Sequence, residues 1–136
     1  MKRSEAREIF MKLLFQMEVQ NDYGVDLKDR FFNEYLSDKS QIGYLEKMFS
    51  QVDENLKDTD NYIESSSKNW KIERINKIDL SVMRTAILEI MHMDDIPESV
   101  SINEAVVMAK KYGTEDSGKF VNGILGKVVR IKNANE

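Results

Sequence analysis

The segment DLSVMRTAILEIMHM, residues 79–93, decides the fold class because its apolar residues lie all around the axis of the helix it predicts. A helix that is apolar on nearly every side has to be enclosed by other elements. We therefore predict that this helix is the central and most buried element of a helical bundle, with Asp79 capping its start. The apolar residues are Leu80, Val82, Met83, Ala86, Ile87, Leu88, Ile90, Met91 and Met93.

Two further helices are predicted after this segment. Pro97 interrupts the chain, and Ser101-Ile-Asn-Glu104 has the form of a capping box opening a helix that ends before Gly113. A last helix is expected from about Glu115 to Arg130.

The chain before the central segment also has helical periodicity. Between residues 4 and 20 the apolar positions follow i, i+3, i+4, i+7, i+8 and i+11, with Ser4 as the expected N-cap. Residues 21–26 indicate a loop, 27–36 a short helix, and 41–68 one long amphipathic helix. Because no segment alternates as a strand does, the sequence predicts an all-α bundle.

Three glycines interrupt the predicted last helix. Gly118, Gly123 and Gly126 each cost about 1 kcal/mol relative to alanine inside a helix, so a close approach should compensate. For Gly118 and Gly126 we favour packing of a neighbouring helix. For Gly123, helix packing and approach of a ligand both remain open.

Composition restricts the class of protein. The 136 residues suit one domain, and the absence of cysteine excludes disulfides and thiolate chemistry and suits a reducing compartment. No apolar run approaches the roughly 20 residues of a membrane span, and the start does not resemble a signal peptide. We expect a cytoplasmic protein with no membrane association.

The sequence offers no residues for catalysis or cofactor binding. His92 is the single histidine, with no orienting partner or nucleophile in view. A metal site would need more ligands than the scattered carboxylates provide, and no glycine-rich phosphate loop follows a strand. We predict that the protein is not an enzyme and has neither a metal site nor another cofactor.

Charge is distributed unevenly along the chain. The net charge is −4, but the excess acid lies in the middle, and residues 110–132 hold six basic against two acidic residues. A polyanion responds to local charge, so a phosphate-binding surface should come from the two ends of the chain. Ordinary solvated helix faces would explain the same pattern.

Two aromatic residues lie off the apolar stripes. Phe15 lies about 180° from Ala6 around the first helix, and Phe120 lies roughly a quarter-turn from the stripe of the last helix. Aromatic rings beside Lys and Arg suit single-stranded RNA, whose unstacked bases lie on such rings. Packing of these rings under the loop at residues 21–26 is the alternative.

The second half of the chain resembles the NusB family of transcription antitermination factors. The resemblance rests on an ordered series: residues 70–79 (WKIERINKID), Met83-Arg84, Glu89, Ile96-Pro97, residues 102–106 (INEAV), Ala109-Lys110 and residues 115–123 (EDSGKFVNG). Residues 6–8 (ARE) and 14–16 (LFQ) extend it to nearly the whole chain. It implies one domain over residues 1–136, with about seven helices in two packed three-helix subdomains, residues 1–69 and 70–136.

The resemblance also implies a function and partners. The family binds the single-stranded boxA element of ribosomal RNA leaders together with the small-subunit ribosomal protein NusE, within the transcription elongation complex. The family pattern places Arg3, Arg7, Phe15, Asp116 and Phe120 against RNA, and Lys2 completes a basic run that is thinner here than is typical. Asp79 matches a position that faces the partner protein.

Other interpretations remain open at this point. A helical protein-interaction module without intrinsic RNA binding would use the same exposed aromatic residues as anchors. A helical domain related to that of some RNA cytosine methyltransferases is a further alternative, although this chain carries no α/β domain for catalysis. The sequence is compatible with both a monomer and a homodimer.

Overall fold

The computed structural model describes residues 1–68 and 70–135, which form seven α-helices and one short 3-10 helix. They are α1 (Arg3–Gln20), α2 (Val25–Tyr35), α3 (Ile42–Ser50), α4 (Val52–Ser66), η1 (Ile72–Arg74), α5 (Lys77–His92), α6 (Glu98–Tyr112) and α7 (Ser117–Ala134). No strand occurs in the described residues, and the predicted all-α fold is confirmed. None of the described helices is long and apolar enough to cross a membrane.

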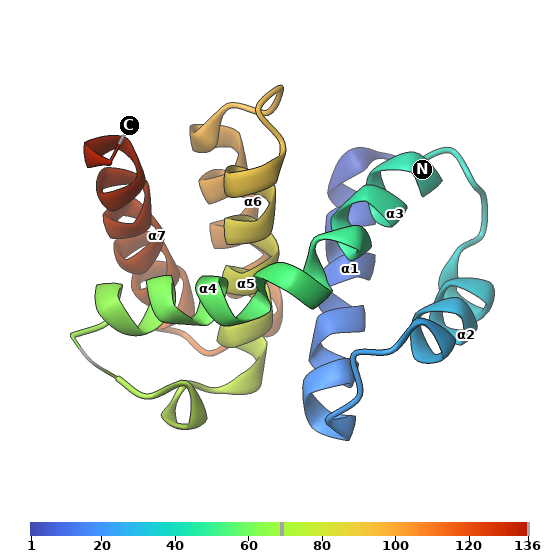
Figure 1. The fold of residues 1–136 in the computed structure, drawn as a ribbon, viewed down its shortest axis with the longest axis horizontal. Coiled ribbons are helices and arrows are strands. Elements are labelled where there is room, and N and C mark those ends of the chain that lie inside the picture. The colour runs from blue at the N-terminus through green and yellow to red at the C-terminus, as the bar shows by residue number, and fades with distance from the viewer. Residues whose placement is uncertain (69, 136) are drawn as a thin grey trace.

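Two clusters of buried side chains form the core. α1, α2 and α3 surround the first cluster, and α4, α5, α6 and α7 surround the second, as the two groups of helices in Figure 1 show. Leu88 and Met93 pack in the first cluster and Met11 of α1 packs in the second, so the two groups share one interface. Because Ile63 of α4 belongs to the second cluster, the cores are not divided at residue 69. The division of the chain into two subdomains, residues 1–69 and 70–136, stays a prediction.

The central helix α5 is the most enclosed element, as predicted. Every residue from Asp79 to Ile90 is buried, and α5 contacts α1, α4, α6 and α7. Its cap was predicted wrongly. Asn76 Oδ1 accepts the backbone N–H of Asp79 at 2.8 Å, so the helix begins at Lys77 and Asp79 lies in its first turn.

The expected long helix over residues 41–68 is two helices that meet at Gln51. The Gln51 backbone is still right-handed helical, with φ −88° and ψ −13°, which explains why the apolar periodicity continues through the break. Val52 packs in the first core cluster and Ile63 in the second. The helix axis changes direction at Gln51 because residues on its two sides pack in different core clusters. The apolar periodicity of the sequence does not show which cluster a residue packs in.

Helix caps were the least accurate predictions. α1 begins at Arg3, so Ser4 lies inside the helix, and α6 begins at Glu98 after Pro97. Ser101 does not cap α6, because its buried hydroxyl donates to Glu89 Oε1 at 2.7 Å. The end of α6 before Gly113 is confirmed, whereas α7 begins and ends slightly later than expected.

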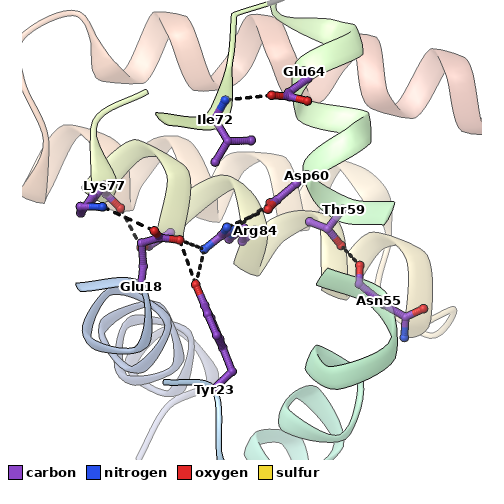
Figure 2. A network of polar contacts seen from close by, with 10 residues as sticks. Glu18, Tyr23, Asn55, Thr59, Asp60, Glu64, Ile72, Lys77 and Arg84 are labelled. Atoms are coloured by element: carbon purple, nitrogen blue, oxygen red, sulfur yellow. Dashed lines mark hydrogen bonds and ion pairs between the residues drawn. The ribbon is translucent and has the colours of Figure 1, made fainter. Parts of the chain in front are cut away.

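A buried polar network centred on Arg84 joins both groups of helices (Figure 2). The Arg84 guanidinium donates to Asp60 of α4 and Glu18 of α1 at 2.8 Å, and to the Tyr23 hydroxyl at 2.9 Å. Tyr23 also donates to Glu18 at 2.9 Å, and its burial raises its pKa to about 12. A buried arginine needs these acceptors, so the network specifies how α1 and α4 lie on α5.

Candidate nucleic-acid interface

Arg7 was predicted to contact RNA, but the structure encloses it between helices. The residue is 5% exposed, its Nε and Nη2 donate to the Glu89 carboxylate at 2.9 Å, and Nη1 donates to Glu104 at 3.2 Å. Burial opposes the charge on Arg7, but the hydrogen bond and charge of Glu89 outweigh it and raise the Arg7 pKa. A guanidinium held in this way has no free edge for a phosphate, so the placement disagrees with a direct RNA contact. Helix periodicity alone could not show that Glu89 stands opposite.

Lys2 and Arg3 lie at the start of α1 beside α3. Arg3 Nε donates to Gln41 Oε1 at 2.7 Å, and the guanidinium carbon lies 4.3 Å from the centre of the Tyr44 ring. Lys2 is exposed. Both cations therefore remain accessible from solvent to some degree, unlike Arg7.

Phe15 lies on an outer face of α1, as its periodicity predicts. It is partly exposed, and the hydrophobic residues packed against either core do not include it. Glu8, Lys12 and Phe15 share this face at i, i+4 and i+7. The side chain is therefore accessible while its neighbours on the same face contact the end of α6.

The outer face of α1 is joined to the α6–α7 junction. The Glu8 carboxylate accepts Lys111 Nζ at 2.7 Å and the Tyr112 hydroxyl at 3.0 Å. Lys12 Nζ lies 5.0 Å from the centre of the Tyr112 ring. The sequence pattern did not identify Lys12, Lys111 and Tyr112 as candidate site residues. Only the contact between α1 and α6 shows that they extend the surface that carries Phe15.

Asp116 and Phe120 open α7 just beyond this junction. Asp116 is exposed, its backbone carbonyl accepts the Phe120 N–H at 3.1 Å, and Ser117 Oγ accepts the Thr114 N–H at 2.9 Å. Phe120 is partly buried against the second core cluster, and its ring centre lies 6.2 Å from that of Trp70. Packing thus holds the ring of Phe120 in place while part of it remains exposed.

Apart from the buried Arg7, the predicted RNA residues fall into two groups. Phe15, Asp116 and Phe120 lie on elements that meet around Tyr112, whereas Lys2 and Arg3 lie beside α3. Along α1 the rise of about 1.5 Å per residue places Lys2 roughly 20 Å from Phe15. A ligand that touches both groups has to be an extended chain.

Asp79, the predicted partner-docking residue, is also buried. It is 3% exposed, and its Oδ2 accepts Asn76 Nδ2 at 2.9 Å, while its Oδ1 has no hydrogen-bond partner among the described residues. A cleft of about 560 Å³ lies beside it, lined by Glu18, Ile72, Glu73, Arg74, Ile75, Asn76, Lys77 and Leu80. Burial disagrees with a direct outward contact by Asp79. The residue instead positions the start of α5, which forms one wall of this cleft.

No group of His, Cys, Asp and Glu side chains within residues 1–68 and 70–135 is arranged to hold a metal ion. His92 ends α5, and its burial lowers its pKa against the opposing charge of Asp94.

Comparison with known proteins identifies the family to which this chain is similar. The model of the NusB family matches residues 4–130. The transcription antitermination protein NusB of Acetivibrio thermocellus is 45% identical over 132 residues, covering 97% of this chain and 91% of that protein. The protein of the same name from Alkaliphilus oremlandii is 43% identical over 129 residues, covering 95% and 94%.

Solved structures agree with this match. T. maritima NusB has a TM-score of 0.85 at 36% identity, covering 96% of this chain and 92% of that one. Antitermination factors NusB and NusE in complex with dsRNA give a TM-score of 0.84 at 22% identity, covering 95% and 96%, and this likeness shows the fold. The near full-length matches at over 40% identity, joined to the helical architecture, show that this chain belongs to the NusB family of transcription antitermination factors.

Proposed function

We propose that this chain binds the boxA element of ribosomal RNA leader transcripts as single-stranded RNA, together with a NusE-type small-subunit ribosomal protein. It does so as a component of the transcription elongation complex, in the cytoplasm. As an antitermination factor it is not an enzyme. The observation that carries the proposal is that the rings of Phe15 on α1 and Phe120 on α7 are both partly exposed, with the exposed lysines Lys12 and Lys111 on α1 and α6.

The chemistry of this surface suits single-stranded RNA. Phe15 and Phe120 each offer a partly exposed ring to an unstacked base, and the exposed Lys12 and Lys111 supply positive charge from α1 and α6. The exposed Asp116 carboxylate accepts hydrogen bonds from base amino or imino groups, which gives a means of sequence discrimination. Lys2 and Arg3 hold the phosphates of a more distant part of the strand, whereas Arg7 acts by holding α1 on α5.

The partner-docking site is proposed at the cleft beside the start of α5. Asp79 acts there by fixing the first turn with Asn76, and the exposed Lys77 and Glu73 at the rim offer charged groups to a partner. A relative of this chain forms a complex with NusE and dsRNA, which supports a partner of this kind.

A salt-dependent titration tests the RNA part of the proposal. A labelled single-stranded boxA-like RNA and a scrambled RNA are titrated with the chain alone and with the NusE-type protein. For single strands the slope of log K against log salt is about −0.7 for each phosphate contacted. We expect tighter binding to boxA-like RNA, a further gain with the partner, and a shallower slope for Lys111→Gln than for the exposed α3 control Lys47→Gln.

Equal affinity for both RNAs, with and without the partner, would leave a protein-interaction module as the function. Sedimentation of the free chain and of the complex reports whether a homodimer dissociates when RNA binds. A homodimer that persists with RNA bound would show that self-association does not cover the RNA surface.

A further inference from the structure

A basic cleft lies between the end of α4 and the outer face of α7, and it shares Phe120 with the surface described above. We call it the α4–α7 cleft. It has a volume of about 510 Å³ and is lined by Ser66, Ser67, Lys68, Trp70, Lys119, Phe120, Gly123, Ile124, Lys127 and Arg130. Only Phe120 of this group was predicted to contact RNA, so most of the cleft is unassigned.

The cations of the α4–α7 cleft have no acidic partner in the part of the chain that the structure describes. Within the described residues, none of the four lining cations, Lys68, Lys119, Lys127 and Arg130, forms an ion pair or a side-chain hydrogen bond, and no lining residue is acidic. Elsewhere in this acidic chain, cations such as Lys28 do find carboxylate partners. A cluster of unpaired cations attracts a polyanion, because its field is not cancelled by neighbouring acids.

An exposed aromatic ring stands among these cations. Trp70 is 52% exposed, and one side of it contacts Phe120, with ring centres 6.2 Å apart and planes inclined at 55°. A base inserted between two rings needs roughly 7 Å between parallel planes, twice the 3.4 Å spacing of stacked bases. The two rings therefore cannot enclose a base between them. Phe120 instead supports Trp70 so that its outer surface is available for stacking.

Gly123 keeps the floor of the cleft open. A Cβ atom built at Gly123 meets nothing within 4 Å, so no neighbouring helix requires glycine there. At Gly118, in contrast, a Cβ would lie 2.9 Å from Lys110 Cγ, which is the close approach that was expected. Of the two explanations left open for Gly123, the structure removes helix packing and leaves access to a ligand.

The basic side chains of α7 form a line beside the rings. Phe120, Gly123, Lys127 and Arg130 follow i, i+3, i+7 and i+10 and so share one face. From Phe120 to Arg130 the helix rises about 15 Å, which matches several stacked nucleotides at roughly 3.4 Å each.

We propose that the α4–α7 cleft is a second RNA subsite, in which a base stacks on Trp70 while Lys127 and Arg130 hold the flanking phosphates of the same single strand. This inference rests on the proposed function and extends it, because the RNA path continues past Phe120 along α7. The ligand class is single-stranded RNA, since a duplex hides the base faces that Trp70 would stack on.

Trp70 is the single tryptophan of the chain, so its fluorescence reports directly on this subsite. We expect quenching when single-stranded boxA-like RNA is added to the full-length chain, and no quenching with the corresponding duplex or with polyglutamate. RNAs shortened from each end in turn locate the subsite, because trimming one end should abolish quenching before it abolishes binding. Quenching by polyglutamate but not by RNA would assign the cleft to an acidic protein and overturn the proposal.

Matched variants separate stacking from charge. Trp70→Ala should raise the Kd for RNA by about 5- to 140-fold, the equivalent of one lost base–aromatic stack of about 1–3 kcal/mol. Tyr35→Ala is the control, since Tyr35 is 53% exposed on α2, outside the cleft. Lys127→Gln combined with Arg130→Gln should make the salt slope shallower by about 1.4, at about 0.7 per phosphate, whereas Lys47→Gln should not.

A last variant tests the cleft without an expected loss of folding stability. Gly123→Leu adds a side chain at the cleft floor, where a Cβ meets no neighbour within 4 Å, and places a better helix former in α7, so it should retain the melting temperature and yet weaken RNA binding. If the parent chain binds boxA-like RNA without tryptophan quenching, and the Trp70 and Gly123 variants bind as well as the parent, the subsite is refuted while the proposed function stands. If the parent binds no RNA with its partner present, both fail.

Discussion

Replacing Arg7 by alanine tests whether this residue belongs to the fold or to the RNA surface. In the structure Arg7 is 5% exposed and Glu89 is 1% exposed on its side chain, and the pair is joined by hydrogen bonds of 2.9 Å. Arg7→Ala leaves the buried Glu89 carboxylate with only the hydroxyl groups of Tyr44 and Ser101 as donors among the described residues. Breaking a buried ion pair in this way costs about 3–5 kcal/mol.

Urea denaturation followed by circular dichroism measures this loss. With an m-value of about 2 kcal/mol/M, the unfolding midpoint should fall by roughly 2 M. The control is Arg3→Ala, which removes one hydrogen bond to Gln41 and a partly exposed contact with the Tyr44 ring and should cost about 1 kcal/mol.

A double replacement guards against a variant too unstable to measure. Arg7→Met with Glu89→Gln removes both buried charges and keeps partners for the two hydroxyl groups. It should regain much of the stability that Arg7→Ala loses, because neutral pairs avoid the desolvation of charge. An Arg7→Ala chain with the parent midpoint and a flatter salt dependence of RNA binding would refute this account and restore Arg7 as a phosphate contact.

Three further outcomes are expected. Phe15→Ala should weaken RNA binding by about 1–3 kcal/mol in the titration and change the free energy of unfolding by less than about 1 kcal/mol, since the ring lies outside both cores; a chain that unfolds easily would mark it as a packing residue. Gly123→Ala should raise stability by about 0.5–1 kcal/mol in a thermal melt, because an added Cβ meets no neighbour, and a lower melting temperature would reveal a contact there. The NMR signal of His92, the single histidine, should titrate below pH 6.5, because burial lowers the His92 pKa. The folded chain should therefore lose stability as the pH falls from about 6.5 through that lowered pKa, and a titration midpoint of His92 above 6.5 would contradict this.

The sequence by itself determined that the fold is all-helical and which helix is central. The apolar residues around residues 79–93 predicted the enclosure of α5, because a helix without a polar face cannot be solvated on any side. Periodicity also placed Phe15 away from the core stripe of α1. These predictions succeeded because each depends only on angles around a single helix axis.

Only the tertiary structure decided which helix and which side chains pack against each helix face. The family resemblance placed Arg7 against RNA, and only the packing of α1 on α5 shows it to be the partner of Glu89. The α4–α7 cleft joins Trp70 to Arg130 across sixty residues of chain, and no local pattern relates the two. The physical reason is that periodicity gives the direction of a side chain about its own axis, whereas burial, ion pairing and clefts depend on which other helix occupies that direction.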